Sequence, residues 1–218
     1  MDHHGAKKLT LSFDNGPHRE VTPWVLDTLA ARGLNATFFV CGKDIADAEQ
    51  QQLLRRIKDE GHRIGNHTFH HARALGVDPD PEAPAREIGV TQTLLADLAE
   101  PERWFRPCGD GGILSARLLS KRAVDYLIEG RYSLVLWNSV PRDWEDPTGW
   151  VNRALSDVEA HRWTLLVLHD VPTGAMKVLP DFLDQVIAHG VEVVHELPPA
   201  CVPIFSGERV ASIDHLVT

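Results

Sequence analysis

The stretch Lys8–Pro17, with the sequence KLTLSFDNGP, contains the pattern that decides the fold. Its first seven residues form an apolar, β-rich run that ends at Asp14, and the Asn-Gly-Pro sequence that follows is typical of a turn. An amphipathic segment comes next, and the same order recurs along the chain. A strand that leads through a turn into a helix is the repeating unit of parallel α/β proteins. The stretch therefore predicts the first strand of such a fold.

Apolar runs alternate with helical segments through most of the chain. The seven runs expected to form strands are Lys8–Asp14, Ala36–Cys41, Arg63–His67, Trp104–Cys108, Tyr132–Asn138, Trp163–His169 and Glu192–Glu196. The six expected helices are Thr22–Arg32, Gln50–Glu60, Ala85–Ala99, Ser115–Ile128, Gly149–His161 and Met176–His189, the first with Thr22 as its N-cap. This alternation predicts an α/β fold with about seven parallel strands, either a barrel or a doubly wound sheet.

Length and composition indicate one folded domain over residues 1–218. Hydrophobic residues make up 43% of the chain and charged residues 24%, as in ordinary globular proteins. The formal net charge is −9, which disfavours binding to a phosphate backbone, so no nucleic-acid partner is expected. The sequence does not fix the oligomeric state, and the tail from residue 198 to 218 has no pattern that predicts its structure.

The amino terminus passes directly into the first expected strand. It lacks the basic and then apolar pattern of a signal peptide, and no run of 18 apolar residues occurs, so we expect a cytoplasmic chain without a membrane partner. The three cysteines are odd in number and widely spaced. They predict neither a disulfide framework nor a Cys-x-x-Cys zinc site.

Polar side chains stand at the carboxyl ends of five expected strands. They are Asp14, His67, Arg106, Asn138 and His169. Because functional sites of parallel α/β folds form at this edge of the sheet, we expect these residues to gather in one site.

Two histidines in the sequence HTFHH are candidate metal ligands. His67 and His71 are four residues apart, so a helical turn after the strand would place both on one face and allow them to bind a metal ion. The alternative is that they are ordinary solvent-facing histidines.

The segment FRPCGDGG supplies a candidate charge partner and a flexible backbone. An arginine buried at a strand end needs an anion, and either Asp14 or Asp143 could pair with Arg106. The glycines would let backbone N–H groups approach a ligand, as an oxyanion hole requires. The alternative is a glycine-rich turn with a surface arginine. Cys108 is better explained as a small buried residue than as a nucleophile.

The last two candidate segments are WNSVPRDW and LLVLHD. Trp137 and Trp144 flank a polar turn, where they could line a sugar-binding cleft or belong to the core. His169 ends an apolar strand, where a lone histidine is often a core residue. With Asp143 available to orient it, a general acid is the alternative.

Taken in order, the segments SFDNGP, HTFHH, FRPCG, SVPRDW and LVLH resemble the motifs of the polysaccharide deacetylase family, also called the NodB homology domain or carbohydrate esterase family 4. The family motifs are TFDDGP, H-[ST]-x-x-H, R-x-P-[YF]-G, D-x-x-D-W and L-x-L-H. The resemblance covers about residues 8–170. It implies a distorted (β/α) barrel and a hydrolase that removes the acetyl group from an N-acetylated amino sugar.

The resemblance also implies a role for each site residue. Asp14 would be the general base and Arg106 its partner, while Asp143 would support His169 as the acid that protonates the leaving amine. Asn15, His67 and His71 would hold a divalent metal ion, and imidazole ligands favour zinc or another first-row metal. Substrate contacts are expected from Cys108 or Gly109 through a backbone N–H, from Trp144, and from Leu168 at the acetyl methyl group.

Three departures from the family motifs leave alternatives open. Asn15 replaces a charged ligand, Cys108-Gly109 changes the usual context of the third motif, and Asn138 or Val140 stands where the fourth motif has its first Asp. One alternative function is hydrolysis of a small cyclic or linear amide, as in allantoinase-like relatives, possible without metal. A second is a catalytically weakened glycan-binding relative.

Overall fold

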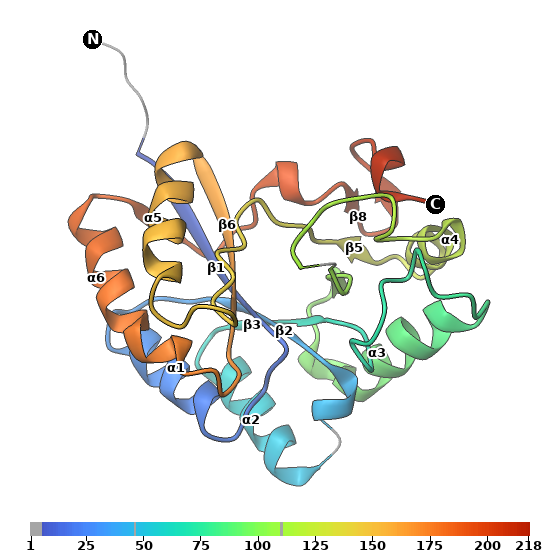
Figure 1. Ribbon diagram of the computed structural model, residues 1–218. Coiled ribbons are helices and arrows are strands. Elements are labelled where there is room, and N and C mark those ends of the chain that lie inside the picture. Colours follow the sequence, from blue (N-terminus) through green and yellow to red (C-terminus); the bar gives the residue numbers. More distant parts are fainter. Residues whose placement is uncertain (1–5, 46, 110) are drawn as a thin grey trace.

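A nine-stranded sheet organises residues 6–45, 47–109 and 111–218, the part of the chain that the computed structural model describes (Figure 1). The order is β6-β1-β2-β3-β4-β5-β8-β9, and β7 pairs with the first half of β1. Strands β1 to β7 are parallel, whereas β8 and β9 are antiparallel. The bounds are β1 Lys8–Asp14, β2 Thr37–Val40, β3 Arg63–Asn66, β4 Trp104–Phe105, β5 Ser133–Leu134, β6 Trp163–His169, β7 Glu192–Val194, β8 Ile204–Phe205 and β9 Glu208–Arg209.

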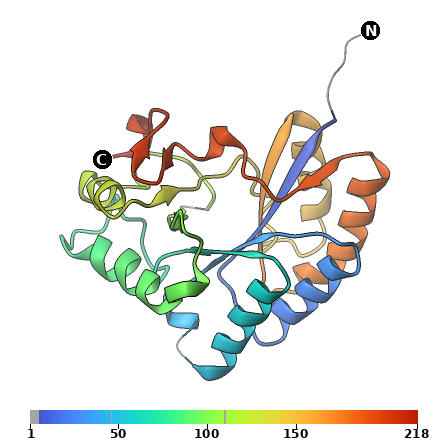
Figure 2. The ribbon, with the colours of Figure 1, turned by 180° about the vertical axis from the view of Figure 1, so that it is seen from behind.

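Helices surround the curved sheet on its outer side, as the two opposite views in Figures 1 and 2 show. The α-helices are α1 Val21–Ala30, α2 Ala48–Asp59, α3 Val90–Leu95, α4 Lys121–Glu129, α5 Trp150–Ala160 and α6 Leu179–Ala188. A π-helix, Ala85–Gly89, leads into α3, and short 3₁₀ turns span Gly42–Asp44, Ala96–Leu98, Ala175–Val178, Pro199–Cys201 and Asp214–Leu216. Among the described helices, none has the length and apolar character that crossing a bilayer requires.

Strand β1 shows how the sequence separates the core from the site. Its apolar residues Leu9, Leu11 and Phe13 have no exposed surface and belong to the large hydrophobic cluster that includes residues of α1, α5 and α6. The alternate residues Thr10, Ser12 and Asp14 are polar and buried. Because successive side chains of a strand point to opposite faces, one seven-residue segment supplies both the core and a polar interior.

The barrel is only partly closed, and the gap lies between β5 and β6. One isolated bridge, Ser139 to Leu166, joins the chain beyond β5 to β6. Asn138 strengthens this junction, since its side chain donates to the carbonyl of Trp163 (2.9 Å) and accepts from the N–H of Leu165 (2.7 Å). The predicted α/β fold with parallel strands is therefore confirmed, and its barrel is partial. Asn138 binds the backbone of β6, which corrects its expected place in the site.

Several expected element boundaries are wrong. Helix α4 begins at Lys121 rather than Ser115, because the Ser120 side chain accepts from the N–H of Ala123 and caps the helix there. Thr22 lies inside α1, which begins one residue earlier, at Val21. The expected helix Ala85–Ala99 is divided among the π-helix, α3 and a 3₁₀ turn, and the tail contains the β8–β9 pair.

Candidate active site

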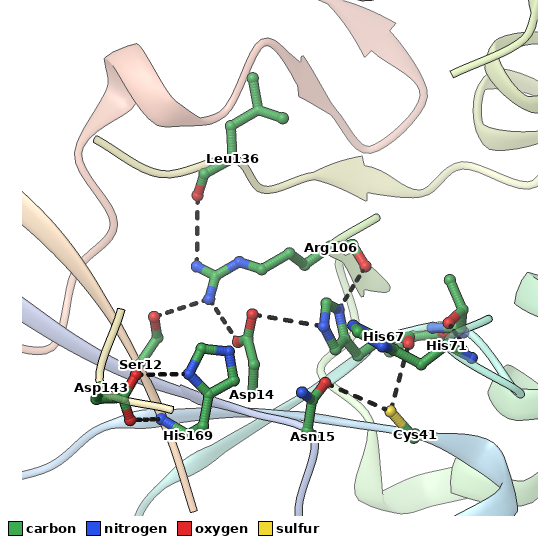
Figure 3. A network of polar contacts seen from close by, with 12 residues as sticks. Ser12, Asp14, Asn15, Cys41, His67, His71, Arg106, Leu136, Asp143 and His169 are labelled. Atoms are coloured by element: carbon green, nitrogen blue, oxygen red, sulfur yellow. Dashed lines mark hydrogen bonds and ion pairs between the residues drawn. The ribbon is translucent and has the colours of Figure 1, made fainter. Parts of the chain in front are cut away.

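The candidate site lies at the carboxyl ends of the parallel strands, around a cleft of about 310 Å³. Asp14 ends β1, His169 ends β6, and the two are register partners on these neighbouring strands. His67 and Arg106 directly follow β3 and β4, so four residues that are distant in sequence lie together (Figure 3). The cleft lining is Asp14, Asn15, His67, His71, Pro107, Gly109, Gly111, Gly112, Trp137, Val140, Trp144, Val167, His169 and Val171.

Asp14 is held as a buried carboxylate. Its Oδ1 accepts from Nη1 of Arg106 at 2.7 Å, and its Oδ2 lies 3.5 Å from Nε2 of His67. Burial opposes ionisation, but the charge of Arg106, followed by the electrostatic influence of His67 and His169, outweighs it, so the pKa of Asp14 is lowered. Asp14 is therefore ionised at neutral pH, with one oxygen paired and the other directed toward the cleft.

Arg106 is fully buried and fixed on several sides. Besides Asp14, its guanidinium donates to Oγ of Ser12 (2.8 Å) and to the carbonyl of Leu136 (3.4 Å). It also lies 3.9 Å from the ring centre of Phe39. The structure selects Asp14, rather than Asp143, as the anion that pairs with this arginine.

His67 is a neutral imidazole in a defined tautomer. Its Nδ1 lies 2.9 Å from the carbonyl oxygen of Arg106, and since a carbonyl can only accept, Nδ1 carries the proton. Burial lowers the pKa of His67 to about 3, so the approach to Asp14 is not an ion pair. The lone pair of Nε2 therefore faces a carboxylate oxygen at 3.5 Å, an arrangement that a cation between or beside them would stabilise.

The turn from His67 to His71 is not the helical turn that the spacing predicts. Thr68 and His71 have φ angles of 67° and 53°, in the left-handed region. The hydroxyl of Thr68 accepts from the N–H of His71 at 3.2 Å. This tight turn still brings the two imidazole rings to 4.7 Å between centres, so the expected proximity is reached by a different backbone path.

Asn15 completes the candidate metal-binding set. It has a φ of 72°, which asparagine tolerates better than most residues, and it lines the cleft. Its Oδ1 is 3.8 Å from Sγ of Cys41. Across the described residues, no cluster of three or more His, Cys, Asp and Glu side chains is arranged to hold a metal. Two imidazoles with the amide oxygen of Asn15 nevertheless suit a divalent first-row ion, although this donor set carries no charge.

His169 faces the cleft with a carboxylate behind it. Its Nδ1 lies 2.8 Å from Oδ1 of Asp143, and its backbone N–H donates to the other oxygen at 2.9 Å. Burial acts to lower the pKa of His169, but the hydrogen bond and charge of Asp143 outweigh it, so the pKa is raised above 6.5. Trp144 packs edge-on against the imidazole, with 4.8 Å between ring centres, and both residues line the cleft.

Comparisons with known proteins agree with this geometry. A family model described as polysaccharide deacetylase matches residues 2–122. The chain belongs to the polysaccharide deacetylase family. It is 34% identical to a chitooligosaccharide deacetylase of Sinorhizobium fredii, over 84% of the chain and 82% of that protein. It is 51% identical to the peptidoglycan-N-acetylmuramic acid deacetylase PdaA of Bacillus subtilis, over 84% and 68%. A solved deacetylase with substrate, T48, superposes with a TM-score of 0.70 at 30% identity, over 89% and 90% of the two chains.

Only some of the residues expected to contact substrate line the cleft. Gly109 and Trp144 line the cleft, whereas the Cys108 side chain is buried beside it. Leu168 has no exposed surface and belongs to the core cluster, so the expected contact with the acetyl group is wrong for this side chain. Val167 lines the cleft instead, because it lies two residues before His169 and shares its face of β6.

Two further residues near the site were not singled out from the sequence. Strand alternation alone would have identified Val167. Asp170 is completely buried beneath the first motif, where a Cβ on Gly16 would meet its carboxylate at 2.2 Å. Burial raises the pKa of Asp170 to about 6. An Asp after a strand-end histidine was the available signal, but only the fold shows that it faces Gly16.

Proposed function

We propose that this member of the family removes acetyl groups from N-acetylated amino sugars in a glycan, in a single catalytic domain spanning residues 1–218. The observation that supports this most directly is the pairing of Asp14 with His169 on adjacent strands. One is an ionised carboxylate held by Arg106, and the other is an imidazole held by Asp143. Amide hydrolysis needs a base for water and an acid for the leaving nitrogen, and this pair supplies both.

Asp14 acts as the general base. Its Oδ1 is occupied by Arg106, which leaves Oδ2 to accept a proton from the attacking water. Arg106 keeps the carboxylate ionised, and it fixes the direction of the free oxygen. The water oxygen then bonds to the acetyl carbon and forms a tetrahedral intermediate.

His169 acts as the general acid. With Nδ1 bound to Asp143, the protonated ring donates from Nε2 to the sugar nitrogen as the carbon–nitrogen bond breaks, which gives a free amine and acetate. The raised pKa keeps a larger fraction of His169 protonated near neutral pH. Trp144 and Trp137 flank the cleft where a sugar ring would bind.

Asn15, His67 and His71 would hold the divalent ion, and imidazole ligands suit zinc or another first-row metal. When bound, such an ion polarises the acetyl carbonyl and acidifies the attacking water. The backbone N–H of Cys108 or Gly109 would donate to the developing oxyanion. Because Asn15 is neutral, we expect weaker metal binding than an Asp at this position would give.

The test is acetate release from N-acetylglucosamine tetramer with added Zn²⁺ or Co²⁺. Asp14→Asn and His169→Ala should each abolish most of the activity, whereas the exposed-residue variants Asp59→Asn and His215→Ala should retain it. Full activity in Asp14→Asn would refute the assigned base. No acetate release from this tetramer or from a glycan with N-acetylmuramic acid would refute the deacetylase proposal.

The expected cytoplasmic location stays a prediction, and fractionation of the cells that produce the natural protein tests it. Recovery of the chain outside the cytoplasm would contradict it.

A further inference from the structure

A carboxylate outside the cleft binds the turn that carries His71. Glu87 lies in the π-helix, and only 8% of its side chain is exposed. Its Oε2 accepts from the backbone N–H groups of Phe69 (3.1 Å) and His70 (2.8 Å). Two consecutive amides of the turn are therefore held by one oxygen atom of a residue 17 or 18 positions further along the chain.

The other oxygen of Glu87 is also bound. Its Oε1 lies 2.8 Å from Nδ1 of His70, and it accepts from Nε of Arg86 at 3.1 Å. Arg86 in turn pairs with Asp78 and Asp80 of the preceding loop. Burial opposes ionisation of Glu87, but the hydrogen bonds from His70 and Arg86 outweigh it and lower its pKa. The carboxylate is therefore ionised and held in one orientation.

The N–H groups of the turn are bound by side chains, whereas its carbonyls at Thr68 and Phe69 accept from the backbone N–H groups of Gly42 (2.9 Å) and Lys43 (3.1 Å). The N–H of Thr68 donates to Oδ1 of Asn66 (3.0 Å), and the N–H of His71 donates to the hydroxyl of Thr68 (3.2 Å). Together with the two amides on Glu87, four consecutive N–H groups are accepted by side chains. Left-handed φ angles at Thr68 and His71 are unfavourable for such residues and persist only where neighbouring contacts impose them.

We propose that Glu87 is a positioning residue for His71. It contacts neither the cleft nor the reacting atoms, and it acts by fixing the two amides that precede His71 in the turn. The inference rests on the proposed function for the role of His71 as a metal ligand. Glu87 lies in a π-helix, a conformation that recurs at functional sites. Side chains that orient metal ligands typically change metal affinity by about 10–100-fold when they are lost.

The experiment compares three variants of the full chain. Glu87→Gln keeps an oxygen that reaches both amides, whereas Glu87→Asp keeps the charge but is too short to reach them. His70→Ala removes the imidazole contact and leaves both amide bonds in place, so it is the matched control. Co²⁺ binding is followed by absorption spectroscopy, and hydrogen exchange of the Phe69 and His70 amides by NMR.

We expect Glu87→Asp to bind Co²⁺ at least about tenfold more weakly and to exchange both amides faster, while Glu87→Gln and His70→Ala stay close to wild type. Equal or tighter Co²⁺ binding by Glu87→Asp than by Glu87→Gln would overturn the proposal, because charge rather than reach would then matter. If the wild-type chain bound no Co²⁺, the metal part of the proposed function would fail. The exchange rates would then still decide whether Glu87 fixes the turn, and unchanged rates in Glu87→Asp would overturn that.

Discussion

Replacing Arg106 with Met tests the central ion pair of the site without any substrate or metal. The guanidinium has no exposed surface, and Asp14 beside it is nearly as buried, with 2.7 Å between their charged atoms. Met is similar in length but apolar, so the variant leaves the Asp14 carboxylate buried without its counter-ion. Breaking a buried pair in this way costs about 3–5 kcal/mol of unfolding free energy. We expect a loss of that size at pH 7.

The loss should depend on pH with a definite sign. In the wild type the pKa of Asp14 is lowered, so its stabilising contribution is complete above pH 3.8 and is lost as the pH falls through the lowered value. In Arg106→Met, the largest influence that lowers the pKa of Asp14 is removed while its burial remains, so the pKa of Asp14 should rise above its value in the unfolded chain. The folded variant then binds a proton more readily than its unfolded chain. The loss of unfolding free energy relative to wild type should therefore be larger at pH 7 than at pH 5.

The assay is urea unfolding at both pH values, followed by the fluorescence of the six tryptophans and with a chelator present. Lys121→Met removes an exposed pair with Asp125 and should cost less than about 0.5 kcal/mol. The double variant Arg106→Met with Asp14→Asn should be more stable at pH 7 than Arg106→Met alone, which keeps the test decisive if the single variant unfolds. A loss of less than about 1 kcal/mol of unfolding free energy at pH 7 in Arg106→Met would refute the reasoning. A double variant no more stable than Arg106→Met would also refute it.

Three further predictions concern the rest of the site. Asp143→Asn should lower the pKa of His169, so the alkaline limb of the pH–rate profile should move to lower pH; an unmoved limb would argue against His169 as the acid. Asn15→Asp should tighten Zn²⁺ binding, measured by competition with a chromophoric chelator, and unchanged affinity would exclude this residue as a ligand. Gly16→Ala should lower the unfolding free energy by about 1–3 kcal/mol, because its Cβ would meet Asp170 at 2.2 Å. Asp170→Ala in the same chain should restore part of that loss in urea unfolding.

The elements predicted best from the sequence are the two longest strands, each of seven residues. Both β1 and β6 have the expected bounds, because each is a buried apolar run that a clear turn signal or a polar residue ends. Strand β5 is shorter than expected, because beyond Leu134 the chain makes contacts that its own sequence does not reveal, such as the bond from the N–H of Leu136 to the carbonyl of Cys201. The β8–β9 pair was missed, although Ser206-Gly207 is a turn signal between its strands and both residues have positive φ.

The site was predictable where it depends on strand ends and unpredictable where it depends on turns. Asp14 and His169 lie together because strand register places them so. The spacing of His67 and His71 correctly suggested proximity, but for the wrong backbone conformation. Glu87 has no motif of its own, since its partners are backbone amides and the contact exists only in the folded chain.

The site therefore has two parts that the fold supports separately. The proposed proton transfer depends on Asp14 and His169, which two adjacent buried strands hold in register. The proposed metal ligands Asn15 and His71 lie in turns with left-handed backbone, which depend on neighbouring side chains. With a neutral residue at position 15, the proposed metal-binding part has no charged ligand, while the hydrogen bonds of Asp14 to Arg106 and of His169 to Asp143 are in place. For this reason we expect the chain to keep its proposed base and acid while binding metal more weakly than an Asp at position 15 would allow.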